Sequence, residues 1–342
     1  MRLTPTVAGG AALCIGLLAG NAAFAGATLD AVKKKGFVQC GVSTGLPGFS
    51  STNDKGEWTG LDVDVCRAIA AAVFGDGSKV KFTPLTSKER FTALQSGEVD
   101  ILSRNTTWSL QRDTALGLNF TNVTYYDGQG FMVPKKLEVT SAKELDGAAV
   151  CVQPGTTTEL NLSDYFRGNG MKFTPVVFEN DDEIRVAFEQ GRCDVFTTDA
   201  SGLYSNRLGM PTPDDYVVLP EIISKEPLGP AVRQGDDEWE NVGRWTVNAL
   251  ITAEELGVTS ENVEEMKGSS DNPNVKRLLG TEDTMGEYLK LDADWAVNAI
   301  KAVGNYGEVF ERNVGQGSPL KIERGLNALW TNGGILYAPP IR

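Results

Sequence analysis

Two charged residues, Arg112 and Asp199, stand a few residues after short hydrophobic stretches in two similar segments of the chain. Each is therefore expected just beyond the end of a buried strand. A guanidinium group can hold a carboxylate through two parallel hydrogen bonds, and an aspartate can accept hydrogen bonds from an ammonium group. A cation and an anion that face each other across a cleft suit a zwitterionic ligand.

The two similar segments are 91–102, with the sequence FTALQSGEVDIL, and 185–196, with the sequence RVAFEQGRCDVF. In both, the end of an amphipathic helix is followed by a glycine, a charged residue and an aspartate that begins a strand. Gly97 and Gly191 suit the left-handed position that closes a helix. The repeat predicts two related α/β units with polar loops after their strands.

Strands and helices are expected to alternate through both units. In the first unit the hydrophobic pattern predicts strands at 37–42, 80–82 and 99–102 and helices at 61–74 and 89–96. In the second unit it predicts strands at 148–153, 173–178 and 194–197 and helices at 158–167, 182–190 and from 201. This alternation indicates mostly parallel sheets with helices on both faces.

Two extended segments suit crossings between the units. Segment 128–134 ends in a proline, and the stretches 217–220 and 227–233 return the chain to the first unit. Paired crossings between two lobes make a hinge, because a few residues at the ends of elements absorb the dihedral change. Two independent domains on a flexible linker are the alternative, but neither segment has linker composition. Further helices are expected at 239–255 and 293–313, packed on the first lobe.

The first 25 residues have the features of a secretory signal peptide. A charged start precedes the apolar run 7–19 and the cleavage-site tripeptide 23–25. No later segment approaches the roughly 20 apolar residues needed to span a bilayer. We therefore expect an exported mature chain. A lipoprotein attached through Cys14 is the alternative, although the residues before it make a poor lipid-attachment sequence.

The composition excludes several classes of function. The chain has 45 acidic and 32 basic residues and a net charge of -13, so nucleic acid and anionic membranes are poor partners. It contains no histidine, which excludes Ser-His-Asp and Cys-His catalysis and histidine-bound zinc. The phosphate-binding G-x-x-x-x-G-K motif is absent as well. We expect neither a cofactor nor a metal.

Four cysteines follow the predicted signal peptide, and an even number in an exported protein favours disulfides. Cys40 and Cys66 belong to the first unit, and Cys151 and Cys193 belong to the second. We therefore expect the pairs Cys40–Cys66 and Cys151–Cys193, although four cysteines allow three connectivities. Four buried free thiols remain the alternative.

Several motifs stand in an order that resembles the periplasmic polar-amino-acid binding proteins of ABC importers. They are LDVDVC at 61–66, ALQSGEVD at 93–100, Arg112-Asp113, LDGAAVCVQPGTT at 145–157 and GRCD at 191–194. The resemblance covers residues 29–249 and the helix near 306–310, and within the family the chain is similar to the general L-amino-acid binding proteins.

The resemblance implies a type II periplasmic binding fold, with lobe 1 at 26–130 and 229–342 and lobe 2 at 131–228. It implies a periplasmic protein that captures free L-amino acids and delivers them to the permease of an ABC transporter. We expect a monomer. An exported enzyme on the same scaffold, similar to cyclohexadienyl dehydratase, is the alternative function, and it would need an acidic residue with a raised pKa in the cleft.

The resemblance also implies roles for individual residues. Arg112 and the Thr107 hydroxyl hold the ligand α-carboxylate, and Asp199 accepts the α-ammonium. Asn105 stands at a position that usually offers backbone groups to the ligand. Thr156 and Thr157 begin a helix after a buried strand, so their free N–H groups suit the same carboxylate. A helix cap without a ligand is the alternative for these threonines.

The side-chain pocket departs from the histidine and lysine binders of the family. Ser43 and Leu46 stand where those proteins carry an aspartate and a tyrosine in the first loop. Phe49 and Trp108 are candidates for the pocket walls. Since no anion or stacking ring is evident for a particular side chain, we expect broad specificity.

Overall fold

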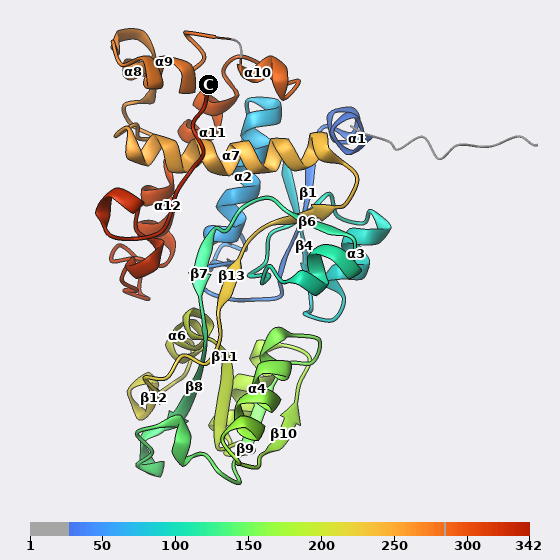
Figure 1. Ribbon diagram of the computed structural model, residues 1–342, viewed down its shortest axis with the longest axis vertical. Helices are drawn as coiled ribbons and strands as arrows, with labels where there is room; N and C mark the ends of the chain where they lie inside the picture. Colours follow the sequence, from blue (N-terminus) through green and yellow to red (C-terminus); the bar gives the residue numbers. More distant parts are fainter. Residues whose placement is uncertain (1–26, 284) are drawn as a thin grey trace, which may run out of the picture.

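The computed structural model describes residues 27–283 and 285–342, and the predicted signal peptide lies outside the described residues. The chain forms two lobes, one above the other in Figure 1, and each is built around a five-stranded sheet. Strands β7 (Tyr125–Asp127) and β13 (Glu226–Leu228) pair with each other between the lobes. These two strands carry the crossings. β13 overlaps the stretch 227–233 predicted to cross, whereas the first predicted crossing, 128–134, is wrong, because it forms strand β8 of the lobe 2 sheet and the chain crosses just before it in β7.

The sheet of lobe 1 has the order β4-β1-β5-β14-β6. Its strands are β1 (Val38–Ser43), β4 (Val80–Leu85), β5 (Ile101–Leu102), β6 (Leu118–Phe120) and β14 (Ala231–Arg233). β1 runs parallel to β4 and β5, whereas β14 runs antiparallel to β5 and β6. Four strands therefore share one direction and β14 is reversed.

The sheet of lobe 2 has the order β10-β9-β11-β8-β12. Its strands are β8 (Gln129–Pro134), β9 (Ala149–Val152), β10 (Thr174–Val177), β11 (Val195–Asp199) and β12 (Tyr216–Val218). Only β8 is reversed. In both lobes the reversed strand follows a crossing, because the chain arriving from the other lobe enters from the opposite end of the sheet. The predicted two-lobed, mostly parallel α/β fold is confirmed.

The two aspartates of the repeat hold the register of the sheets. Asp100 Oδ2 accepts a hydrogen bond of 2.6 Å from the backbone N–H of Gln39, and Asp194 Oδ2 accepts one of 2.9 Å from that of Ala149. Each aspartate therefore ties its own strand to the parallel neighbour. Gly97 and Gly191 have φ of 80° and 71°, the left-handed conformation that the sequence predicts.

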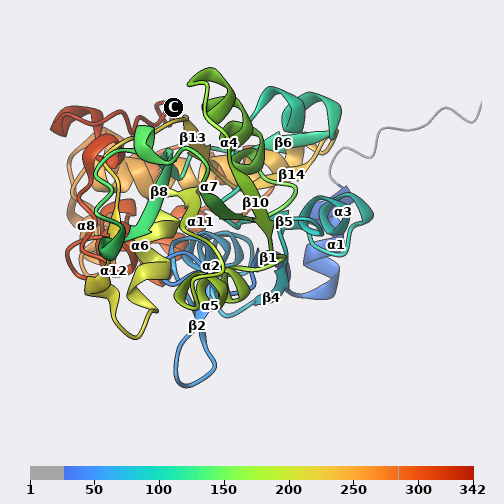
Figure 2. The ribbon, with the colours of Figure 1, turned by 90° about the horizontal axis from the view of Figure 1, so that it is seen from below.

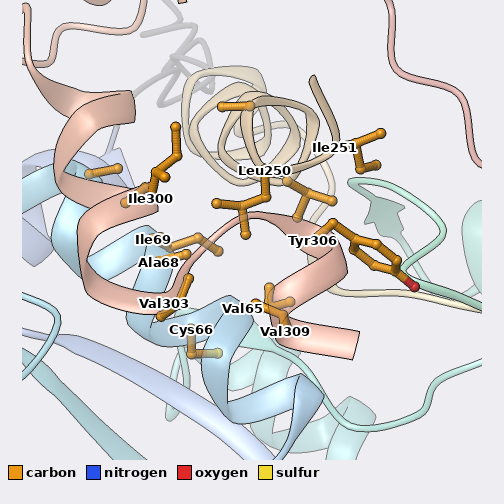
Figure 3. Close-up of a cluster of buried hydrophobic side chains, with 14 of the residues drawn as sticks. Val65, Cys66, Ala68, Ile69, Leu250, Ile251, Ile300, Val303, Tyr306 and Val309 are labelled. Carbon is orange, nitrogen blue, oxygen red and sulfur yellow. The ribbon is translucent and has the colours of Figure 1, made fainter. Parts of the chain in front are cut away.

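Helices of distant segments form the core of lobe 1. They are α1 (Ala27–Lys35), α2 (Leu61–Phe74), α3 (Arg90–Ser96), α7 (Asp237–Glu255), α11 (Trp295–Val303) and α12 (Tyr306–Asn313). Figure 3 shows Ile69 of α2, Leu250 of α7 and Ile300 of α11 in one cluster, where all three are buried. Helices α11 and α12 of the C-terminal region therefore pack against α2 and α7.

One predicted helix is wrong in its length. The pattern over 293–313 indicated a single helix, but the structure has two, which meet at Gly304 and Asn305. Gly304 has φ 83° and ψ -178°, a conformation almost confined to glycine. Asn305 then caps α12, and its side chain and that of Glu308 each accept a hydrogen bond from the other's backbone N–H.

The sheet of lobe 2 is covered on both faces. α4 (Thr157–Gly168) lies over one face, and α5 (Asp181–Glu189) and α6 (Ala200–Leu208) lie over the other. Alternate residues of β8 serve the two faces, since Phe131 belongs to the cluster under α4 and Met132 to the cluster under α5.

The remaining elements lie at the periphery of lobe 1. They are β2 (Ser51–Thr52), β3 (Trp58–Thr59), α8 (Val263–Ser269), α9 (Pro273–Leu278) and α10 (Met285–Tyr288). The turn that joins β2 and β3 projects from the body (Figure 2). Within residues 27–283 and 285–342, none of the helices has the length and apolar character needed to cross a membrane.

The C-terminal segment also contacts the crossing strand β7. The Asn327 side chain accepts a hydrogen bond of 2.6 Å from the N–H of Tyr126 and donates one of 3.1 Å to the carbonyl of the same residue. The Tyr306 hydroxyl donates to the carbonyl of Thr124 at 2.7 Å. The outer edge of β7 is therefore held by residues from the end of the chain.

The described residues contain two disulfides, and they are the pairs predicted from the sequence. Cys40–Cys66 joins β1 to α2 with a Cα–Cα distance of 6.3 Å. Cys151–Cys193 joins β9 to the loop before β11 with a Cα–Cα distance of 5.6 Å. Each bridge lies within one lobe, so neither restricts movement of one lobe against the other.

Candidate functional site

The lobes contact each other near the ends of their strands, and we call the region between the lobes the cleft. Ser87 Oγ of lobe 1 donates to Gln153 Oε1 of lobe 2 at 2.8 Å. At a second point Ser205 Oγ of lobe 2 donates to the carbonyl of Pro47 in lobe 1, also at 2.8 Å. The cleft therefore has polar contacts between the lobes at more than one place. In α/β sheets the carboxyl ends of the strands are the usual place for ligands.

Arg112 and Asp199 reach this cleft from different lobes. Arg112 lies on a single helical turn after β5, where its Nη1 donates to the carbonyl of Thr107 at 2.9 Å. Asp199 is the last residue of β11. Both side chains are buried, and neither forms an ion pair within 4.0 Å with any residue that the structure describes.

Burial shifts the pKa of both groups toward the neutral form. It lowers the pKa of Arg112 to about 10, although the neighbouring carboxylates of Glu226 and Asp199 oppose the shift. It raises the pKa of Asp199 well above the ordinary value, and Asp127 and Glu226 raise it further. A ligand with an anionic and a cationic end would supply both missing counter-charges, which offsets the cost of burying each charge.

Thr107 and Asn105 lie in the loop between β5 and Arg112. The Thr107 hydroxyl donates to Glu226 Oε2 at 2.6 Å. Asn105 has a positive φ of 35°, and its N–H donates to Asp62 Oδ2 at 2.9 Å. Its side-chain oxygen is buried and has no partner in the part of the chain that the structure describes. The backbone N–H of Asn105 is thus committed to Asp62.

Thr156 and Thr157 stand at the start of α4. The Thr156 hydroxyl donates to the carbonyl of Gln153 at 2.8 Å and accepts from the N–H of Glu159 at 3.2 Å, so it is the helix cap that the sequence left as an alternative. Its own hydroxyl proton is therefore used within lobe 2. The Thr157 hydroxyl points into the cleft region and donates to Glu226 Oε2 at 2.9 Å.

The four residues expected at the side-chain pocket lie in different surroundings. The Ser43 hydroxyl is buried and has no partner among the described residues. Leu46 and Phe49 belong to the core of lobe 1. Trp108 is 38% exposed and stacks on Phe120 at 5.5 Å between ring centroids. As ligand contacts, all four remain predictions.

Two further arginines, Arg90 and Arg104, are buried beside the site. Each has 3% relative exposure, and in each the Nε atom has no hydrogen-bond partner among the described residues. The guanidinium groups of Arg90 and Arg112 both lie over the ring of Phe91, at 4.7 and 5.1 Å from its centroid. Sequence reasoning missed both residues. Arg104 stands in the polar loop after β5, but no local pattern marks Arg90 as buried.

Buried carboxylates accompany these arginines. Asp62, Asp127 and Asp181 have pKa values raised to about 6, and in each case burial is the main cause. The charge of Arg104 opposes the shift at Asp62 and Asp181. This region therefore contains buried groups of both charge signs, which suits small polar ligands.

Comparison with known proteins assigns the family. Residues 38–316 match the model of the bacterial extracellular solute-binding proteins, family 3. The chain belongs to this family. It is a solute-binding protein and not an enzyme, so the dehydratase alternative is set aside.

Similar proteins cover almost the whole chain. A protein of Rhizobium johnstonii, named general L-amino acid-binding periplasmic protein AapJ, is 64% identical over 100% of this chain and 99% of its own length. The glutamate/glutamine/aspartate/asparagine-binding protein BztA of Rhodobacter capsulatus is 56% identical over 95% and 96%. A solved structure of a periplasmic binding protein from Brucella ovis with glutathione bound has 63% identity and a TM-score of 0.90, and the match covers 92% of this chain and 99% of that one.

Proposed function

We propose that this solute-binding protein captures free L-amino acids in the periplasm, with broad side-chain specificity, and delivers them to the permease of an ABC importer. The observation that carries the proposal is the pair of buried, unpaired charges, Arg112 from lobe 1 and Asp199 from lobe 2. The names of the relatives support it, since AapJ is called a general L-amino-acid binding protein and BztA a binder of four amino acids.

The α-groups, common to all L-amino acids, are the part of the ligand that this pair recognises. Arg112 has donors beyond the one bonded to Thr107, and these bind the α-carboxylate together with the N–H groups at the start of α4. Asp199 accepts the α-ammonium. The side chain of the ligand extends toward the remaining buried polar groups of the cleft. No single one of these groups selects one type of ligand side chain.

Contacts to both lobes explain why binding closes the cleft. A ligand held by Arg112 and Asp199 interacts fully only when the lobes are together, so it favours the closed form. The short strands β7 and β13 are the only crossings within the described chain, and they absorb the rotation. The closed protein is the form that the permease receives.

Calorimetric titration with the twenty L-amino acids and glutathione tests this function. We expect several amino acids to bind the wild-type protein, and we expect Arg112→Ala and Asp199→Ala to weaken all of them by a hundredfold or more, roughly the effect of a lost buried charge pair. Matched controls are Arg167→Ala and Asp164→Asn, which alter an exposed ion pair on α4. Wild-type affinity in both cleft variants would refute the proposed site.

A further inference from the structure

Glu226, on the crossing strand β13, is a carboxylate that both lobes share. It is 1% exposed. Its Oε2 accepts hydrogen bonds from Thr107 of lobe 1 at 2.6 Å and from Thr157 of lobe 2 at 2.9 Å. Its Oε1 accepts from Asn161 of lobe 2 at 2.8 Å and from Ser224 at 2.6 Å. Four donors therefore converge on one buried carboxylate at the hinge.

The two threonine hydroxyls cannot serve Glu226 and a ligand at the same time. A hydroxyl has one proton to donate. In Thr107 and Thr157 that proton points to Glu226, and the two hydroxyl oxygens lie 3.3 Å apart. These are the hydroxyls expected at the α-carboxylate of the ligand, so an incoming carboxylate must take them from Glu226.

We propose that Glu226 is an internal substitute for the ligand carboxylate: it stabilises contact between the lobes in part before a ligand binds, and it is displaced by the ligand, which completes closure. The inference rests on the proposed function, because it requires a ligand carboxylate beside Arg112. It makes Glu226 a residue that competes with the ligand, whereas Arg112 and Asp199 bind it.

The electrostatic surroundings agree with this role. Among neighbouring charges, Glu226 supports the charged form of Arg112 more strongly than Asp199 does. Glu226 therefore already supplies part of the negative charge that a ligand carboxylate would bring to this guanidinium. A ligand carboxylate placed nearby is repelled by Glu226 as long as its side chain keeps its present position.

The substitution Glu226→Gln tests the proposal, because the amide keeps the shape and removes the anion. We expect the ligand-free variant to be more open, measured as the distance between spin labels at exposed positions 55 in lobe 1 and 172 in lobe 2. We also expect its affinity for L-glutamine and L-alanine to increase about tenfold, comparable to one charge-assisted hydrogen bond. Glu221→Gln is the matched control, since Glu221 accepts hydrogen bonds from Ser141 and Ala142 within lobe 2.

Weaker or unchanged affinity of Glu226→Gln, or an unchanged ligand-free distance, would overturn the proposal. A residue that accepts the ligand ammonium would give the weaker affinity, and a residue that does not hold the lobes together would give the unchanged distance. Asn161→Ala provides a second test if the first variant does not fold. It removes one lobe 2 donor from Glu226 and should shift the distance and the affinity in the same direction by a smaller factor. The wild-type titration tests the proposed function separately, and the label distance needs no ligand.

Discussion

The carboxylate of Asp62 accepts a hydrogen bond from the backbone N–H of Asn105 at 2.9 Å, although the two residues are 43 positions apart. Asp62 is the second residue of α2, and this bond fixes the loop that leads to Arg112. Asp62 is buried in this position, and burial raises the pKa of its carboxyl group to about 6.

The raised pKa of Asp62 predicts how stability depends on pH. Between about pH 4 and 6 the folded protein holds a proton that the unfolded chain has lost, so the contribution of Asp62 falls as the pH rises through this range. The total is about 3 kcal/mol for a shift of about two pKa units. Urea unfolding across this range should show a shallower dependence for Asp62→Asn than for the wild type. Asp54→Asn, in the exposed turn between β2 and β3, should leave the dependence unchanged.

The raised pKa of Asp199 predicts that ligand binding releases protons. The ligand ammonium favours the charged carboxylate and lowers the pKa, so a fraction of Asp199 that is protonated in the free protein ionises on binding. Affinity should therefore rise with pH until Asp199 is fully charged. Titration at about pH 6 in two buffers of different ionisation enthalpy measures the release. Proton uptake would contradict this assignment, and the exposed variant Asp164→Asn should behave like the wild type.

Removal of the lobe 2 disulfide should lower the free energy of unfolding. Cys151–Cys193 closes a loop with a sequence separation of 42, worth about 4 kcal/mol by the loop-entropy relation. We expect the double variant Cys151→Ala, Cys193→Ala to lose about that amount in urea unfolding. Ligand affinity should change little under conditions in which the protein remains folded. A stability equal to that of the wild type would show that the loop is already ordered in the unfolded chain.

Gly304→Ala should destabilise the protein at the junction between α11 and α12. A Cβ atom at this position would lie 2.8 Å from the Cβ of Glu308, in a backbone conformation that alanine avoids. We expect a loss of about 2 to 3 kcal/mol, from strain and from the disturbed cap of α12. Gly170→Ala is the control, because Gly170 also has a positive φ but an added Cβ would meet nothing within 4 Å. Thermal unfolding of the two variants should therefore differ.

Elements bounded by local signals were predictable from the sequence. Helix α2 spans the predicted residues 61–74, because Gly60 precedes it and Gly75 closes it in the left-handed conformation. The repeat identified the strand ends that carry the polar loops. The break between α11 and α12 also had a signal, since Asn305 and Glu308 have the spacing of a capping box, but the hydrophobic period continued across it.

The interior of the cleft was less predictable. Arg112 and Asp199 follow strands, so the pattern located them. Glu226 carries no such mark, since its partners Thr107 and Thr157 come from segments 119 and 69 positions away. The burial of Arg90 likewise results from the packing of loops that are distant in sequence, and local periodicity contains no information about it.

The hydrogen bonds between Asn327 and Tyr126 have a consequence for the design of shortened proteins. A shortened chain whose last residue comes before position 327 would keep every cleft residue. It would lack the Asn327 side chain, which holds the outer edge of β7. Such a protein would retain the residues that contact the nutrient, but the strands between its lobes would be less rigid. The tail of the polypeptide is thus part of the mechanics of uptake.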